Sequence, residues 1–187
     1  MADEIWLIRH GATAWSVTGQ HTGRTDLPLT EEGEREAAQL IPKLAGERFD
    51  AVLCSPLRRA LRTCEICGFA SQARREPDCM EWDYGELNGL TRDAYRERHP
   101  GWTIWQGPVP GGESLAEVAR RAARVLGGLA ALDGRAAIFA HGHFLRILTA
   151  VYLGLDPAAA RHFALTTARV SVLGRDNGEA AILAWNR

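Results

Sequence analysis

Three residues at the end of a short apolar run carry the clearest chemical signal in this chain. Arg9, His10 and Gly11 directly follow the run 5–8, which is predicted to form a buried strand. In open α/β sheets, functional groups gather beyond the carboxyl ends of such strands. An arginine offers a fixed cation, a histidine offers a base or nucleophile, and a glycine lets the backbone approach a ligand closely. The tripeptide therefore indicates a site for an oxyanion such as phosphate.

A second apolar run ends in the same dipeptide. Residues 136–140 are predicted to form a strand, and His141, Gly142 and His143 follow them. Either histidine alone is more typical of a surface loop or of a satisfied core position. Two strands that end in His-Gly favour the interpretation that both tips converge on one pocket.

Further motifs stand between these two segments, in a fixed order. They are Gly-Gln-His-Thr-Gly-Arg-Thr-Asp-Leu-Pro-Leu-Thr at 19–30 followed by Glu-Glu-Gly, Ser-Pro-Leu-Arg-Arg-Ala at 55–60, Glu-Trp-Asp-Tyr-Gly-Glu-Leu-Asn-Gly at 81–89, and Gly-Glu-Ser at 112–114. Together with 7–16 and 140–143, they resemble the histidine phosphatase superfamily, which has the phosphoglycerate mutase-like fold. The resemblance covers nearly the whole chain. It is strongest to small broad-spectrum acid phosphatases of mycobacterial type and to sedoheptulose bisphosphatase-like enzymes.

The resemblance implies that His10 is the nucleophile and that His141 stabilises the transferred group as a donor. A phosphate ester resists attack because its oxygens are negative, and forked arginine donors such as Arg9 and Arg59 match those oxygens. From the residues alone, the basic segment around Arg59 is more typical of a solvated helix face. The motif selects Arg59 over its neighbour Arg58.

The leaving alkoxide needs a proton, and Glu81 is the candidate general acid. Trp82 and Tyr84 can give it an apolar setting, while Asp83 and Glu86 are rivals in the same segment. Without the resemblance, this segment is more typical of an exposed acidic loop. The family pattern places the acid four residues before a glycine and so selects Glu81.

Two further groups of residues complete the predicted site. The residues predicted to bind phosphate or substrate are Gly11, Ser16, Thr22, Gly23 and Gly142. The residues predicted to support the catalytic groups or to shape specificity are Gln20, His21, His143, Trp102 and Trp105. Ser16 occupies a position where most mutases carry asparagine, and serine can still donate one hydrogen bond.

We expect a metal-independent phosphatase for small phosphate monoesters, with no cofactor. Two alternatives stay open: a cofactor-dependent phosphoglycerate mutase, and a member that binds phosphorylated ligands with little catalysis. The mutases carry a longer basic insertion after the acid-bearing loop, whereas this chain continues with Trp102 and Trp105. The chain keeps the catalytic set, so a purely binding role has no support in the sequence. The carboxylates lack a recognisable metal-ligand spacing.

Composition agrees with one globular domain over 1–187. The 187 residues are 46% hydrophobic and carry a net charge of −1, so there is no broad basic field for nucleic acid. The first residues do not form a signal-peptide pattern, and no run reaches the ~18 to 20 apolar residues that a membrane span needs. We expect a cytoplasmic protein, monomeric or homodimeric, that binds a small phosphorylated substrate, no nucleic acid and no membrane. The four cysteines are expected to be reduced and largely buried.

Alternating elements predict a single three-layer α/β/α sandwich with a mostly parallel mixed sheet. Strands are expected at 5–8, 51–54, 136–140, 170–173 and 181–185, and helices at 31–45, 57–67, 91–98, 114–131 and 144–153. Asp176, Asn177 and Gly178 are typical of a hairpin turn between the last two strands. The stretch 99–112 is rich in proline and glycine, which favours an irregular segment that acts as a lid.

Overall fold

A six-stranded mixed sheet forms the centre of the structure, a computed structural model that describes residues 2–187. Its strands are β1 (Glu4–Arg9), β2 (Ala51–Cys54), β3 (Ala73–Arg75), β4 (Arg135–Ala140), β5 (Val170–Asp176) and β6 (Glu179–Ala184). Their order in the sheet is β3-β2-β4-β1-β5-β6. The pairs from β3 to β1 are parallel, and β5 and β6 add antiparallel pairs. The expected mostly parallel mixed sheet is confirmed.

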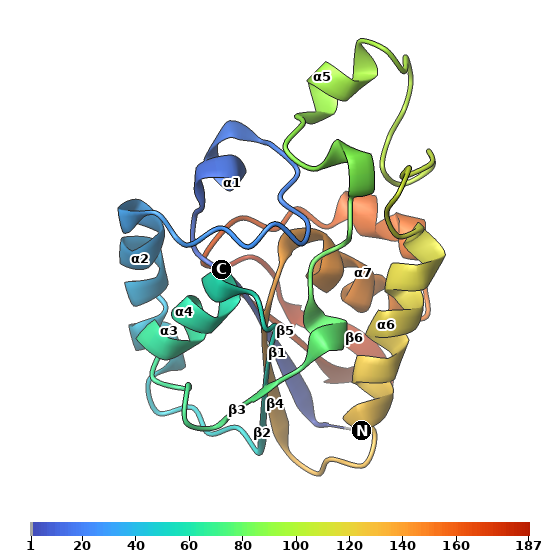
Figure 1. Cartoon of the computed structure of the whole chain (residues 1–187). Coiled ribbons are helices and arrows are strands. Elements are labelled where there is room, and N and C mark those ends of the chain that lie inside the picture. Colours follow the sequence, from blue (N-terminus) through green and yellow to red (C-terminus); the bar gives the residue numbers. More distant parts are fainter. Residues whose placement is uncertain (1) are drawn as a thin grey trace.

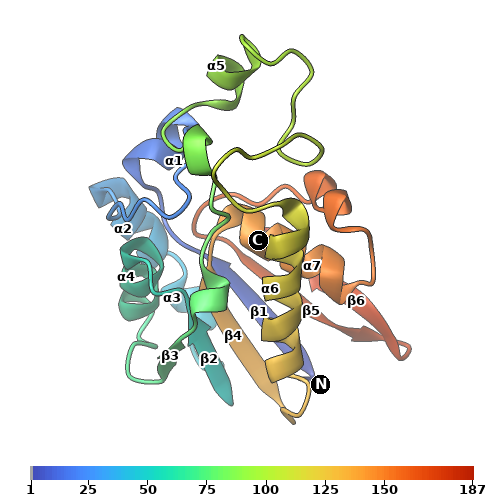
Figure 2. The same cartoon turned by 45° about the vertical axis from the view of Figure 1, so that its right-hand side comes forward.

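Helices cover both faces of this sheet. They are α1 (Ala14–Thr18), α2 (Glu31–Ala38), α3 (Ile41–Leu44), α4 (Arg58–Ile66), α5 (Arg92–Arg96), α6 (Leu115–Gly128) and α7 (Gly142–Tyr152). Helices α2 to α4 lie on one side of the sheet, and α6 and α7 lie on the other (Figures 1 and 2). The structure therefore has the predicted three layers.

The alternation of side chains along the strands explains why there are two cores. On β1, Ile5 and Leu7 belong to the cluster that packs against α6 and α7, while Trp6 and Ile8 belong to the cluster beneath α2 to α4. Successive side chains of a strand point to opposite faces, so a continuous apolar run becomes buried on both sides. The apolar run therefore fixes β1 as a central strand.

Most expected elements are present, but the single helix at 31–45 was a wrong prediction. The chain forms α2 and the short α3 instead, and Pro42 lies near the start of α3. Proline has no backbone N–H and clashes with the carbonyl four residues earlier, so a continuous helix cannot pass this point. The structure also contains elements that the sequence did not predict: α1, the edge strand β3 and three 3₁₀ helices at 77–79, 85–87 and 157–162.

The register of β1 and β4 brings the two His-Gly segments together. Arg9 is paired with Ala140 in this parallel ladder, so the residues that follow both strands leave the sheet side by side. The backbone N–H of His10 also donates to the Ala140 carbonyl at 3.1 Å. The predicted convergence of the two strand tips is thus confirmed.

Gly11 and Gly33 allow the loop after β1 to pass directly against α2. A Cβ atom on Gly11 would lie 2.1 Å from the Gly33 carbonyl oxygen, and a Cβ on Gly33 would lie 2.0 Å from the Ala12 carbonyl oxygen. No side chain fits at either position. The close backbone approach that the sequence predicted at Gly11 is therefore made to another part of the chain.

The segment 99–112 contains no regular helix or strand, as expected. Together with α5 it rises above the carboxyl ends of the parallel strands (Figures 1 and 2). Trp102 and Ile104 are buried and anchor the segment to the rest of the core. The hairpin is also confirmed: Asn177 and Gly178 both have positive φ, as a tight two-residue turn requires.

Within the described residues, all four cysteines are buried and carry free thiols, as the sequence predicted. Across residues 2–187, none of the helices combines the length and apolar character needed to cross a membrane.

Candidate active site

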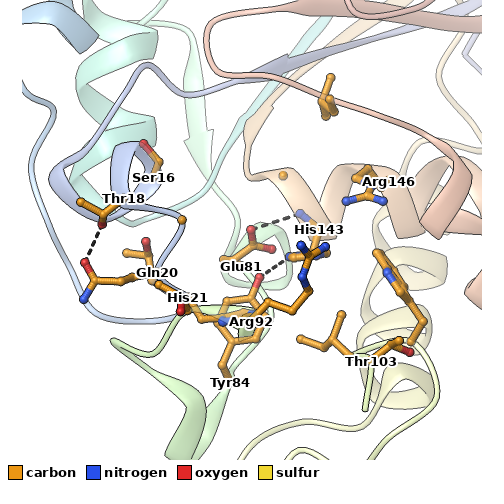
Figure 3. A pocket seen from close by; sticks show the side chains of 18 of the residues that line it. Ser16, Thr18, Gln20, His21, Glu81, Tyr84, Arg92, Thr103, His143 and Arg146 are labelled. Atoms are coloured by element: carbon orange, nitrogen blue, oxygen red, sulfur yellow. Dashed lines mark hydrogen bonds between the residues drawn. The ribbon is translucent and has the colours of Figure 1, made fainter. Parts of the chain in front are cut away.

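A cavity of about 730 Å³ opens above the carboxyl ends of β1 and β4. Its walls come from the end of β1, the loop 16–23, α4, the acid-bearing loop, the segment 99–112 and the start of α7 (Figure 3). The predicted site residues that line it are Arg9, His10, Ser16, Gln20, His21, Thr22, Gly23, Arg59, Glu81, Trp102, Trp105, Gly142 and His143. His141 and Gly11 lie beside His10, behind this surface.

His10 presents one unprotonated ring nitrogen. Its Nδ1 lies 2.7 Å from the Gly11 carbonyl, which can only accept, so Nδ1 carries the proton. Its Nε2 accepts a hydrogen bond from Arg59 Nε at 3.3 Å. Burial, together with the nearby arginines, holds the pKa of His10 well below its usual value of 6.5. The Nε2 lone pair therefore stays available for attack on phosphorus.

Arg59 is the centre of a hydrogen-bond network. It comes from the first turn of α4, and only 1% of its surface is exposed. Besides His10, its Nε lies 3.2 Å from Nδ1 of His141, and its other nitrogens donate to the carbonyls of Gly23 at 2.7 Å and Thr25 at 3.0 Å. Arg59 thereby fixes both histidine rings and the loop that contains Gly23. Its neighbour Arg58 is exposed, so the choice made by the motif agrees with burial.

Arg9 lines the same cavity as His10 and Arg59, and it has no carboxylate partner among residues 2–187. Its terminal nitrogen donates to the Leu165 carbonyl, while its buried Nε has no hydrogen-bond partner in the described chain. A Cβ atom on Gly142 would lie 3.1 Å from Arg9 Cζ, so the glycine at the start of α7 makes room for the guanidinium. An unsatisfied buried donor beside Arg59 and His10 is what an oxyanion site requires.

His141 is fully buried, with both ring nitrogens engaged. Nδ1 accepts from Arg59, so Nε2 carries the proton and donates to the Ser55 hydroxyl at 2.7 Å. Burial, with Arg59 as the next cause, lowers the pKa of His141 well below 6.5. Without substrate, His141 is therefore neutral, with its lone pair toward Arg59. The ring centroids of His10 and His141 are 5.1 Å apart.

Glu81 holds its carboxylate at the start of α7. Its Oε1 accepts the backbone N–H groups of Trp82 and Phe144 at 3.0 and 2.9 Å, and its Oε2 accepts that of His143 at 3.1 Å. The side chain is 7% exposed and lines the cavity. Oε2 keeps a second lone pair, which can carry a transferable proton.

The surroundings of Glu81 agree with the expected apolar setting. Trp82 and Tyr84 are both buried. The rivals lie elsewhere: Asp83 pairs with Arg24 at 3.5 Å, and Glu86 is exposed. Neither rival lines the cavity.

The motif at 112–114 supports the acid-bearing loop. Glu113 accepts two hydrogen bonds from Arg121, at 2.7 and 2.9 Å, and accepts the backbone N–H of Asp83 at 3.0 Å. The Glu113 carbonyl accepts from the Trp82 indole at 2.7 Å. Arg121 also donates to the carbonyl of Met80 at 3.0 Å. These bonds fix the backbone on both sides of Glu81.

The predicted phosphate-binding residues divide into two groups. Thr22, Gly23 and Gly142 line the cavity beside the catalytic groups. Ser16 also lines it, but its hydroxyl accepts from Thr13 N at 2.8 Å and donates to the Thr13 carbonyl at 3.0 Å, so it caps α1. Gly11 donates its N–H to the Thr63 hydroxyl at 3.2 Å, and its carbonyl accepts the hydrogen bond from His10 Nδ1.

The half-buried His143 and the buried Tyr84 form a pair that the sequence did not indicate. The Tyr84 hydroxyl lies 2.5 Å from His143 Nδ1 (Figure 3). Burial raises the pKa of Tyr84 well above 10, so the hydroxyl keeps its proton, and in residues 2–187 it has no other acceptor. Tyr84 therefore donates to Nδ1, and the proton of neutral His143 sits on Nε2. His21 packs edge-on against Tyr84, with ring centroids 4.8 Å apart.

The two tryptophans of the segment 99–112 have different roles. Trp102 is buried, and its indole donates to the Pro108 carbonyl at 3.0 Å, so it stabilises the segment itself. Trp105 is half-buried and packs against His143, with ring centroids 5.0 Å apart. The guanidinium carbon of Arg146 lies over the Trp105 ring, 4.7 Å from its centroid.

Sequence reasoning missed three residues of this site, Ser55, Thr63 and Arg146, and gave Tyr84 only an apolar role. Ser55 and Tyr84 stand inside the motifs described above, so their motif positions are the available signal. Thr63 lies four residues after Arg59 on α4, and Arg146 lies three residues after His143 on α7. Helical spacing alone places such residues on one face, but it does not say which face is functional.

The described residues contain no group of three or more His, Cys, Asp or Glu side chains that could hold a metal ion. The absence of a metal requirement stays a prediction.

Comparisons with known proteins agree with this geometry. A family model described as the histidine phosphatase superfamily (branch 1) matches residues 5–187, and the chain belongs to this family. An acid phosphatase of Mycobacterium tuberculosis is 40% identical over 93% of this chain and 87% of its own length. A sedoheptulose 1,7-bisphosphatase of Saccharomyces cerevisiae is 30% identical over 80% of this chain and 67% of its own length.

Relatives with a mutase name are also similar to this chain. A probable phosphoglycerate mutase GpmB of Cronobacter sakazakii is 32% identical over 90% of this chain and 83% of its own length. A solved structure, the product of a Mycobacterium tuberculosis open reading frame, superposes with a TM-score of 0.89 at 34% identity, covering 100% of this chain and 98% of the other. The family and its phosphatase members support a phosphomonoesterase, and the mutase alternative has less support.

Proposed function

We propose that this chain hydrolyses small phosphate monoesters through a covalent phosphohistidine on His10, in a single catalytic domain over 1–187. The observation that carries the proposal is the His10 ring itself. Its Nδ1 proton is held by the Gly11 carbonyl, and its Nε2 lone pair faces Arg59. Neither Arg59 nor the nearby Arg9 has a carboxylate partner in residues 2–187. The phosphoryl oxygens can therefore serve as the counter-charge of both arginines.

In the first step, the Nε2 lone pair of His10 forms a bond to phosphorus while the bond from phosphorus to the ester oxygen breaks. Glu81 delivers its proton to the departing oxygen, so the alcohol leaves neutral. In the second step, water attacks the phosphohistidine, Glu81 takes a proton from that water, and the bond from phosphorus to Nε2 breaks. Inorganic phosphate and the starting histidine result.

His141 acts on the charged transition state. Its Nδ1 faces Arg59 in the substrate-free site, and an anionic phosphoryl group beside it favours the imidazolium form. The protonated ring then adds a donor to those of Arg9 and Arg59. Thr22, Gly23 and Gly142 complete the wall of the phosphate subsite.

The test combines turnover with detection of the intermediate. His10→Ala should abolish release of phosphate from an aryl phosphate and leave thermal unfolding close to that of the wild type. The alkaline-quenched wild-type enzyme should carry label from a ³²P-labelled ester at His10. His162→Ala is the matched control, because His162 is exposed and does not line the cavity. Near-normal turnover in His10→Ala, or label at another residue, would contradict the proposal.

Product analysis separates the phosphatase from its alternatives. A phosphatase releases inorganic phosphate, a mutase interconverts 2- and 3-phosphoglycerate with little free phosphate, and a binding protein does neither. A cytoplasmic location and a monomeric or homodimeric state stay predictions of the sequence.

A further inference from the structure

The cavity carries more positive charge than one phosphate monoester needs. Six arginines line it, against the two carboxylates Glu81 and Asp93. Asp93 is paired with Arg92 at 3.2 Å, and Arg9 and Arg59 face the nucleophile. Arg96, Arg146 and Arg161 remain, and none of them has a carboxylate within ion-pair distance in the described part of the chain.

Arg146 is the most firmly oriented of these three. Its Nε donates to the Ala160 carbonyl at 3.0 Å, and its Nη2 donates to the Arg161 carbonyl at 3.1 Å. The guanidinium also stacks on the ring face of Trp105. These contacts occupy the Nε–Nη2 edge of the Arg146 guanidinium and one face of its plane. Nη1 and the second proton of Nη2 are left to form another pair of parallel donors.

The surroundings of Arg146 disfavour an uncompensated cation. The side chain is half-buried, and desolvation lowers the pKa of its guanidinium. A cation in such a place is stabilised when an anion joins it. No carboxylate among residues 2–187 forms an ion pair with Arg146, and Glu81 raises the pKa of its guanidinium less than desolvation lowers it. A ligand can therefore supply the missing counter-charge.

The position of Arg146 along α7 decides which part of a substrate it meets. Helix α7 begins at Gly142, which lies next to Arg9. His143 and Arg146 are three residues apart on this helix, so they lie on the same face. In Figure 3 the Arg146 guanidinium lies beyond His143 as seen from Glu81. In the proposed mechanism, Glu81 protonates the ester oxygen that leaves phosphorus, so this oxygen lies next to Glu81. Arg146 therefore faces the alcohol part of the ester.

We propose that Arg146 binds a second anionic group, a carboxylate or a phosphate, on the alcohol part of the substrate. The preferred substrates are then phosphate monoesters with two anionic groups. This inference rests on the proposed phosphatase function. The competing explanation is structural: Arg146 only ties α7 to the 3₁₀ helix at 157–162 through the two carbonyls.

The experiment compares paired esters that differ by one anionic group. 3-Phosphoglycerate against glycerol 1-phosphate tests a carboxylate, and fructose 1,6-bisphosphate against fructose 6-phosphate tests a second phosphate. In the wild type, kcat/KM should favour the doubly anionic member of at least one pair, and added salt should reduce that preference. A wild-type ratio at or below one for both pairs would overturn the inference without any variant.

The variants then assign the preference to Arg146. Arg146→Met should lower kcat/KM for the preferred ester with two anionic groups by about 10- to 100-fold more than for its partner with one anionic group, because a charge-assisted fork is lost. The loss should fall mainly on KM. Arg146→Lys should recover part of it, since the charge returns without the fork.

Arg124→Gln is the control, because Arg124 pairs with Asp78 on the exposed face of α6, outside the cavity. Equal losses for both members of each pair in Arg146→Met would show a structural role only. If the wild type hydrolyses none of the four esters or an aryl phosphate, the proposed function itself fails. Hydrolysis with no dependence on the second charge defeats this inference alone.

Discussion

Replacing Glu81 by glutamine separates the chemical role of this carboxyl group from its structural role. Glutamine retains one oxygen, which can keep the bonds from the N–H groups of Trp82 and Phe144. Its NH₂ group then faces the N–H of His143, which loses its acceptor. One buried donor becomes unsatisfied, and the cavity loses its transferable proton.

The structural cost follows from that single donor. An unsatisfied buried N–H costs about 1–3 kcal/mol. For a domain of this size, such a loss lowers Tm by roughly 2–12 °C. Glu81→Gln should therefore remain folded at 25 °C, so its kinetics report on chemistry.

The chemical cost depends on the leaving group. General acid catalysis is worth typically ~10²- to 10⁴-fold when the departing oxygen is basic. We expect kcat/KM for an alkyl phosphate, which covers only the steps up to formation of the phosphohistidine, to fall by about that factor in Glu81→Gln. Aryl phosphates should lose less than about tenfold, because a phenolate leaves with little help from a proton.

The assay is the initial rate of phosphate release from a glycerol phosphate and an aryl phosphate, with thermal unfolding measured on the same samples. Glu86→Gln is the matched control, because Glu86 belongs to the same loop but is exposed and does not line the cavity. An equal loss of kcat/KM for both ester classes in Glu81→Gln would refute the role of general acid in the first step. A loss as large in Glu86→Gln would refute the assignment to Glu81.

Three further outcomes are expected. First, His10 stays neutral well below pH 6.5, so kcat/KM should not decline as pH falls from 7 through 6.5. The pKa values of His10, His141 and His143 are lowered in the folded protein, so below pH 6.5 only the unfolded chain takes up protons at these residues. The free energy of unfolding in urea should therefore fall, by about 1.4 kcal/mol at pH 5.5 for each histidine that stays neutral in the folded protein. A constant free energy of unfolding from pH 7 to 5.5 would contradict this. Second, Gly142→Ala should displace the guanidinium of Arg9, whose Cζ would lie 3.1 Å from the new Cβ, and should weaken inhibition by inorganic phosphate by about tenfold, as one charge-assisted contact is lost. Unchanged inhibition would mean that Arg9 does not bind phosphate. Third, activity should persist in excess chelator; loss with chelator and recovery with added magnesium or zinc would show a metal requirement.

The local patterns that the sequence predicted well are those with a local physical cause. The apolar run 5–8 forms a central strand because it is buried on both faces, and Asn177 and Gly178 form a turn because both tolerate positive φ. The wrong helix at 31–45 has a local cause as well, because Pro42 interrupts the helical spacing of its apolar residues. Strand β3 gave no periodic signal, because it spans three residues and two of them are exposed arginines.

The motifs define the chemical inventory: two strands that end in His-Gly, two arginines and an acid in a fixed order. Which atoms face one another depends on how the chain folds. The β1–β4 register brings His10 and His141 to one Arg59 nitrogen, and the Gly11 carbonyl holds the Nδ1 proton of His10, which leaves the lone pair on Nε2. Arg146 became a candidate only when burial, Trp105 and the absence of a nearby carboxylate in the described chain were known. Such contacts join residues far apart in sequence, and neither periodicity nor motif spacing encodes the distances between them.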